Sequence, residues 1–251
     1  MEIWTSLLEG LEAILRFFQG LVDPLVPAYS WAFAIIMLTI AVRIVLLPLA
    51  VKQIRSMRAM QRLQPEIKKL QEKYKVDRSL MKSDPEKYRA KRQKQQEAMM
   101  ALYKEHNVNP MAGCLPLIAQ APLFIALFWL LDSRRGVVVE ELTTFGFVGI
   151  DSLSATAASG NGIGAYVLVI FMGASTWLTQ KQMMASNPTA GQNPQQKMLM
   201  YILPPMLTVF AFNFPAGVVL YWVTTNIWTM VQQWVMFRNA QPPSQAAPKT
   251  A

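Results

Sequence analysis

A single arginine interrupts the most apolar stretch of the sequence, WAFAIIMLTIAVRIVLLPLAV, which covers residues 31–51. At a rise of 1.5 Å per residue, such a stretch is long enough for a helix that spans a bilayer. Its two polar residues, Thr39 and Arg43, are four apart and therefore share one face of that helix. Burying a central arginine costs roughly 2.5 to 3.5 kcal/mol on insertion scales. The side chain of Arg43 therefore either snorkels toward the surface at Lys52 or lies as a positive charge in a hydrated cavity.

The groups available to act with Arg43 are uncharged. No Asp or Glu occurs in any of the five apolar runs of the sequence, so we expect Arg43 to be left without a partner in its own chain. The candidate polar neighbours are Gln120, Gln180, Tyr221, Trp222, Thr224, Thr225 and Asn226. A hydrated cation of this kind is suited to a transient guest, because an acidic segment of another polypeptide would be attracted to it.

The residues that are missing argue against several other mechanisms. A coupled transporter normally needs an intramembrane carboxylate, and an ion channel needs a polar ring. The sequence has one cysteine, Cys114, and one histidine, His106, which excludes an intramolecular disulfide framework and His-rich or Cys-rich metal sites and disfavours a catalytic pair. It has no nucleotide-binding loop of the Walker type. A small-solute transporter or channel stays open as the alternative, as does a structural assembly factor for another membrane complex.

Composition indicates an integral membrane protein. The chain has 251 residues, of which 53% are hydrophobic, and a mean hydropathy of +0.23. Its formal charge of +9 is concentrated in one segment, because residues 52–106 contain 16 Lys and Arg against 7 Asp and Glu. This segment predicts a helical hairpin along a methionine-rich seam, with a turn near Asp84-Pro85. It is either a solvated hairpin without a partner or a surface for anionic lipid, or for RNA near a ribosome.

The first residues predict an amphipathic helix in the membrane interface. Its apolar positions recur at helical spacing and are Ile3, Trp4, Leu7, Leu8, Leu11, Ile14, Leu15 and Phe18. By the positive-inside rule the basic hairpin is cytoplasmic, which puts the N-terminus outside and the C-terminus inside.

We therefore predict an all-α integral membrane protein with five transmembrane helices, forming a hydrophilic groove open to the cytoplasm. The expected segments are the interfacial helix (1–27), first span (28–51), hairpin (52–108), second span (109–132), outer loop (133–161), third span (162–180), cytoplasmic loop (181–197), fourth span (198–213), fifth span (214–237) and a disordered tail (238–251).

Five motifs together resemble the bacterial branch of the YidC/Oxa/Alb family of membrane protein insertases. They are TIAVRIVLLPL (39–49), LQPEI (63–67), EAMMALYKEHNVNP (97–110), NPMAGCLPLIAQAPLFIALFWLL (109–131) and FPAGVVLYWVTTNIWTMVQQ (214–233). They occur in order across the predicted membrane core, so their agreement is more specific than any one of them.

The resemblance implies an insertase and chaperone of the bacterial plasma membrane, with no enzymatic reaction, cofactor or small-molecule substrate. The groove arginine of the family falls on Arg43, with Thr39 one turn away, its glutamine on Gln180 and its aromatic residue on Trp222. The implied partners are nascent membrane proteins, the ribosome and the Sec translocon, and we expect a functional monomer. The sequence departs from the long forms in having no large extracytoplasmic domain, and its short, nearly uncharged tail argues against ribosome binding through the tail.

Overall fold

The computed structural model describes residues 2–74, 83–108, 115–131, 139–186 and 194–238. Within these ranges the protein is helical, with isolated β-bridges as the sole extended pairing. The α-helices are α1 (Glu2–Val22), α2 (Ser30–Val45), α3 (Leu47–Arg62), α4 (Gln64–Lys73), α6 (Pro85–Glu105), α7 (Leu115–Leu131), α8 (Val139–Thr144), α9 (Gly162–Ser186), α10 (Pro194–Ala211) and α11 (Ala216–Arg238). Cys114 and the predicted disordered tail beyond Arg238 lie outside the described residues.

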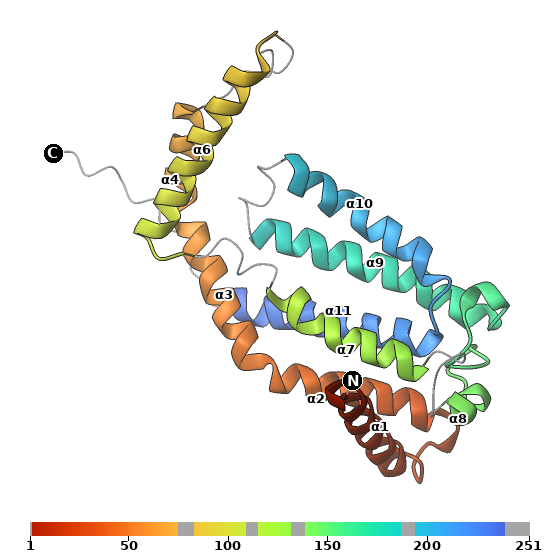
Figure 1. The fold of residues 1–251 in the computed structure, drawn as a ribbon. Helices are drawn as coiled ribbons and strands as arrows, with labels where there is room; N and C mark the ends of the chain where they lie inside the picture. The colour runs from red at the N-terminus through yellow and green to blue at the C-terminus, as the bar shows by residue number, and fades with distance from the viewer. Residues whose placement is uncertain (1, 75–82, 109–114, 132–138, 187–193, 239–251) are drawn as a thin grey trace.

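The long helices form one bundle with a projecting hairpin. Figure 1 shows α2, α7, α11, α9 and α10 running in roughly the same direction, while α4 and α6 extend beyond one end of the bundle. Helix α11 is central, because it packs on α9, α2 and α7. Helix α10 packs on α9, and α1 packs across α2 and α7. The helical bundle therefore places α2, α7 and α11 against one another.

Pro48 divides the apolar run that the sequence analysis treated as one span (28–51). Helix α2 ends at Val45 and α3 begins at Leu47, and Figure 1 shows the change of direction between them. A proline cannot donate a backbone hydrogen bond, and its ring crowds the carbonyl four residues earlier, so a straight helix is disfavoured here. Arg43 consequently lies in the last turn of α2, beside this break, instead of deep within a continuous helix.

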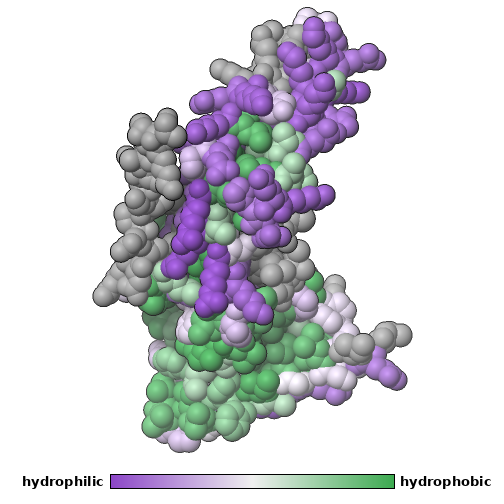
Figure 2. Space-filling model, turned by 90° about the vertical axis from the view of Figure 1, so that its left-hand side faces the viewer, coloured by the Kyte–Doolittle hydropathy of each residue, from purple (hydrophilic) through white to green (hydrophobic). Residues whose placement is uncertain are grey.

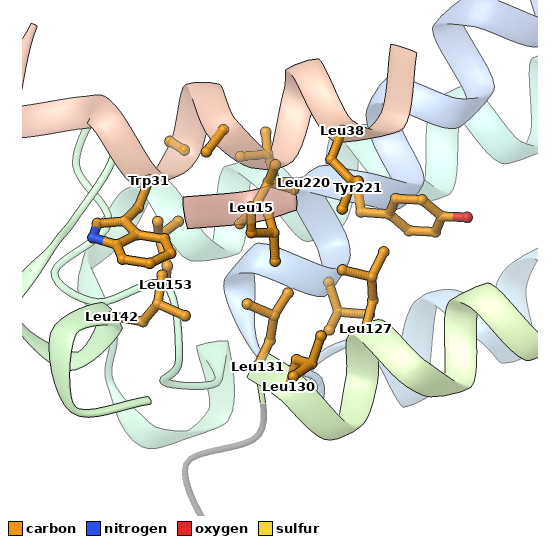
Figure 3. Close-up of a cluster of buried hydrophobic side chains, with 14 of the residues drawn as sticks. Leu15, Trp31, Leu38, Leu127, Leu130, Leu131, Leu142, Leu153, Leu220 and Tyr221 are labelled. Carbon is orange, nitrogen blue, oxygen red and sulfur yellow. The ribbon is translucent and has the colours of Figure 1, made fainter. Parts of the chain in front are cut away.

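The larger apolar core lies where α1, α2, α7 and α11 meet. Leu15, Trp31 and Leu127 are fully buried in it. Figure 3 shows these side chains converging from different helices, with the ring of Tyr221 at the edge of the cluster and its hydroxyl pointing away from the leucines. Burial of this apolar surface fixes the spacing of α2, α7 and α11, and it leaves the phenol oxygen of Tyr221 free to meet a polar group.

The loop after α8 holds the start of α11 in place through backbone hydrogen bonds. The first N–H groups of a helix have no partner within it. Here the amide of Ala216 donates to the carbonyl of Ala155 at 2.9 Å, and the amide of Gly217 donates to that of Leu153 at 2.8 Å. The buried side chain of Asn161 braces the same loop, donating to the Ala155 carbonyl at 3.0 Å. These bonds set the position of α11 along its axis.

The hairpin is held by a small apolar seam of its own. Met60, Leu63 and Ile67 are buried, and side chains of the opposite arm pack against them, namely Met99, Leu102, Tyr103 and Val108. The first arm of the hairpin divides at Leu63, before Pro65, into the end of α3 and the whole of α4. Figure 2 shows hydrophilic side chains covering the hairpin, in contrast to the apolar surface lower in the molecule.

Two helical stretches, Pro27–Val45 and Gly162–Met184, are long and apolar enough to cross a membrane. Among the described residues, Gln120–Leu131 and Tyr201–Ala211 are shorter apolar helices. Large apolar side chains are exposed along α9 and α10, as expected of surfaces that face lipid. The number of spans, predicted as five, stays a prediction.

The seam of the hairpin generates a pH-dependent prediction. Burial raises the pKa of the Tyr103 phenol above its ordinary value of about 10. Because the folded hairpin holds this proton more tightly than the unfolded one, the contribution of Tyr103 to the stability of the hairpin is constant below about pH 10 and falls as the pH rises through the raised pKa. We expect spin labels on α4 and α6 to separate at a higher pH in Tyr103→Phe than in the parent. Separation over the same pH range in both proteins would contradict this explanation.

The contact between α9 and α10 generates a second prediction. A Cβ atom at Gly173 would stand 2.5 Å from Thr208 Oγ1 and 2.9 Å from its Cγ2. Gly173→Ala should therefore force the helices apart and cost about 1–3 kcal/mol. We expect a lower midpoint of thermal unfolding in detergent, largely restored by adding Thr208→Ala.

The matched control is Gly10→Ala in α1, where a Cβ atom would meet nothing within 4 Å. This substitution should be neutral or slightly stabilising, because alanine favours the helix. A parent-like midpoint in Gly173→Ala would show that α9 and α10 are not closely packed at this point.

Candidate functional site

Polar side chains from three helices form a hydrogen-bonded cluster around Arg43. Arg43 Nη2, from α2, donates to Gln120 Oε1, from α7, at 2.8 Å. Gln120 Nε2 in turn donates to the hydroxyl of Tyr221, from α11, at 2.8 Å, with a longer contact of 3.4 Å to Thr225 Oγ1. We call these four residues the Arg43 cluster.

Local structure explains why these side chains meet. Tyr221 and Thr225 are four residues apart in α11, so they lie on the same helix face and both point toward Gln120. The Tyr221 side chain is only 2% exposed, which fixes its position. Arg43 lies in the last turn of α2, where the partial negative charge of the helix C-terminus favours a cation.

No carboxylate among the described residues compensates the charge of Arg43. The ion pairs found among the described residues are Arg16–Glu12, Arg16–Glu141 and His106–Glu66, and none of them involves Arg43. The expectation that Arg43 would have no partner in its own chain is wrong, because Gln120 accepts a hydrogen bond from it. The partner is nevertheless a neutral amide, so the half-buried guanidinium keeps its full positive charge.

Thr39 lies one turn from Arg43 on α2 but makes a different contact. Its side chain is 1% exposed, and its hydroxyl donates to the carbonyl of Ile35 at 2.7 Å. This bond within the helix satisfies the hydroxyl locally. Among the described residues, no hydrogen bond joins Thr39 to the Arg43 cluster.

Asn226 ties α11 to α9 and is separate from the Arg43 cluster. Its amide nitrogen donates to Ser175 Oγ at 3.0 Å and to Thr176 Oγ1 at 2.9 Å, and the side chain is 6% exposed. Both hydroxyls donate hydrogen bonds to the Met172 carbonyl. Their oxygen lone pairs can therefore accept the hydrogen bonds from Asn226. The sequence carries no signal for this pairing, because the pairing depends on the register of two helices.

The three remaining candidate residues lie outside the Arg43 cluster. The hydroxyl of Thr224 donates to the carbonyl of Leu220, within α11, at 2.8 Å. Trp222 packs its ring edge to face with Phe124, at 5.1 Å between ring centroids and an interplanar angle of 86°. Gln180 is half-buried on α9, and within the described part of the chain it forms no hydrogen bond with the Arg43 cluster. Of the predicted residues, the structure thus joins Arg43, Gln120, Tyr221 and Thr225, and it leaves the others outside this network.

The described residues contain no group of three or more His, Cys, Asp and Glu side chains that could hold a metal ion. What the cluster offers chemically is hydrogen-bond donation from a fixed cation. It is suited to binding a negatively charged or strongly polar group, and it holds no pair of titratable side chains arranged for acid–base or nucleophilic chemistry.

Fold and site together define a helical membrane protein with a cation held among its apolar helices. The family model described as "60Kd inner membrane protein" matches residues 22–243. The chain is 39% identical to the "Membrane protein insertase YidC" of Streptomyces avermitilis, over 87% of this chain, and 38% identical to the "Membrane protein insertase MisCA" of Bacillus subtilis, over 82% of it. The chain belongs to the 60Kd inner membrane protein family, to which its resemblance to the YidC/Oxa/Alb insertases already pointed.

A solved structure agrees with this assignment. An active YidC insertase crystal structure, with its first transmembrane domain resolved, superposes with a TM-score of 0.63 at 27% identity, over 92% of this chain and 46% of that one. The chain spans 54% of the Streptomyces relative and 70% of the Bacillus one, and 36% of the YidC of Actinobacillus pleuropneumoniae serotype 3. It therefore corresponds to part of the longer relatives.

The hydrogen-bond geometry assigns different roles to two polar side chains: Asn226 stabilises the packing of α9 and α11, whereas Arg43 is available for binding. Asn226→Leu removes two hydrogen bonds between α9 and α11, a loss of about 0.6–2 kcal/mol for groups inside a membrane. We expect its midpoint of thermal unfolding in detergent to fall, whereas Arg43→Ala should unfold at or above the midpoint of the parent, because it removes a half-buried charge. The opposite ranking would mean that Arg43 is needed for stability and Asn226 is not.

Proposed function

We propose that this protein is a membrane protein insertase and chaperone that carries out no chemical conversion. The observation that carries the proposal is an arginine between apolar helices whose partner, among the described residues, is a neutral side chain, in a chain 39% identical to a protein named as an insertase. A permanent carboxylate partner would make such an arginine a structural ion pair. Without one, the charge is available to a guest.

The proposed mechanism uses this charge as a temporary partner. A hydrophilic segment of a nascent membrane protein enters a groove open to the cytoplasm, and its acidic side chains are partly neutralised by Arg43. Local hydration shortens the apolar barrier that the segment must cross. The hydrophobic helix of the guest then moves sideways into lipid along the exposed apolar faces of the bundle. Thr39, Gln180, Trp222 and Asn226 are proposed to line this route together with the Arg43 cluster.

The proposed arrangement in the plasma membrane has five spans, with the N-terminus outside and the C-terminus in the cytoplasm. The basic hairpin supports this orientation by the positive-inside rule. Each Lys or Arg near an anionic membrane surface contributes about 1 kcal/mol of attraction, so the hydrophilic hairpin in Figure 2 is well suited to anionic lipid headgroups. Contacts with the ribosome and the Sec translocon are proposed from the family resemblance, as is function as a monomer.

The mechanism predicts that insertion depends on the charge at position 43. Arg43→Ala should reduce insertion of clients with one or two spans and acidic outer segments by about tenfold or more, the effect expected from losing one charged interaction. Arg43→Lys should be milder, because it keeps the charge. Protease protection of the translocated segment in proteoliposomes measures the inserted fraction. Full insertion of every client by Arg43→Ala would rule out the charge mechanism.

A crosslinking experiment tests the route itself. Photoreactive side chains at positions 39, 180 and 222 should crosslink to a nascent membrane protein stalled on the ribosome, with a pattern that depends on the length of the nascent chain. The absence of crosslinks from all three positions would rule out the proposal that these positions line a groove for the nascent chain. Solute flux in proteoliposomes that depends on Arg43 would instead favour a transporter.

A further inference from the structure

We propose that Gln120 is a positioning residue that anchors the Arg43 guanidinium while leaving its charge uncompensated. The inference rests on the proposed function and assigns Gln120 a role in choosing among clients. The evidence is the chain of hydrogen bonds that runs from α11 through Gln120 to Arg43.

Both the oxygen and the nitrogen of the Gln120 side-chain amide form hydrogen bonds. Its oxygen accepts from Arg43 at 2.8 Å and its nitrogen donates to Tyr221 at 2.8 Å. The orientation of the amide is forced, because arginine has only donors and a flipped amide would point its NH₂ group at the guanidinium. Tyr221 is itself fixed by burial against the large apolar core. The position of α11 thereby determines where the Arg43 guanidinium on α2 is held.

The neutrality of the amide is the feature that matters for a guest. A guanidinium has five N–H donors arranged to match a carboxylate, and the bond to Gln120 comes from only one of its nitrogens, Nη2. A glutamate at position 120 would have nearly the same shape and could still accept from Arg43. It would also cancel the charge through a close ion pair in a poorly solvated site. A leucine would leave the charge but release the guanidinium from its fixed position.

Placing a negative charge at position 120 should therefore cause a defect that depends on the client. Two clients should be compared, one with an acidic outer segment and one in which the same Asp and Glu residues are changed to Asn and Gln. Gln120→Glu should lower insertion of the acidic client by about tenfold, the fold-change of one charged interaction, and leave the neutral client unchanged. Gln120→Leu should lower insertion of the acidic client by a smaller factor.

The matched control is Gln232→Glu. Gln232 accepts a hydrogen bond from Trp228 within α11, at 2.8 Å, so this variant makes the same change of charge outside the Arg43 cluster. It should insert both clients as the parent does. The midpoint of thermal unfolding of Gln120→Glu should be at or above that of the parent, whereas a merely structural role for Gln120 would lower the midpoint and affect both clients equally.

Two results would overturn the inference in different ways. If Arg43→Ala is defective but Gln120→Glu inserts the acidic client normally, Gln120 does not govern the charge, and the proposed function stands. If Arg43→Ala itself inserts the acidic client normally, the charge mechanism of the proposed function fails, and the role of Gln120 fails with it.

Discussion

The hydrogen bond between Arg43 Nη2 and Gln120 Oε1 is the contact that the packing of the surrounding helices positions. It holds a full positive charge among apolar helices by means of a neutral acceptor. An isolated charge is expensive in such surroundings, and the usual compensation is a carboxylate. Here the compensation is distributed over an amide, a helix C-terminus and partial exposure, which stabilise the cation without neutralising it. A charge held in this way can still interact with a second molecule.

Much of the fold serves to bring these few polar atoms together. The apolar core of α1, α2, α7 and α11, whose side chains are drawn in Figure 3, fixes the distances between the helices. The loop that receives the first amides of α11 fixes the position of that helix along its axis, and hence the height of Tyr221. The break before Pro48 ends α2 just beyond Arg43 and directs α3 toward the hairpin. Loss of any one of these features would separate the donor from its acceptor.

The sequence predicted the type of fold well, because apolar length, charge segregation and helical periodicity are local signals. It also identified Arg43, since an arginine in an apolar run stands out without knowledge of neighbours. It did not predict the pairing with Gln120, because residues 77 positions apart meet only through the packing of α2 and α7. The division of the first apolar run was visible in Pro48, but its length suggested a single span. Asn226 was placed with Arg43 because both are polar residues in apolar runs, whereas its orientation toward α9 depends on helix register.

The most direct test of whether the uncompensated charge of Arg43 binds the guest is to exchange the charges of the site and of the guest. Insertion by the parent and by Arg43→Glu should be measured in proteoliposomes with two clients, one bearing an acidic outer segment and one bearing lysines at the same positions. The ratio between the two clients cancels effects of the membrane and of protein amount. We predict that the parent favours the acidic client and that Arg43→Glu reverses this order. An unchanged order of preference in Arg43→Glu would contradict the account, because the charge at position 43 would then not be what the guest meets.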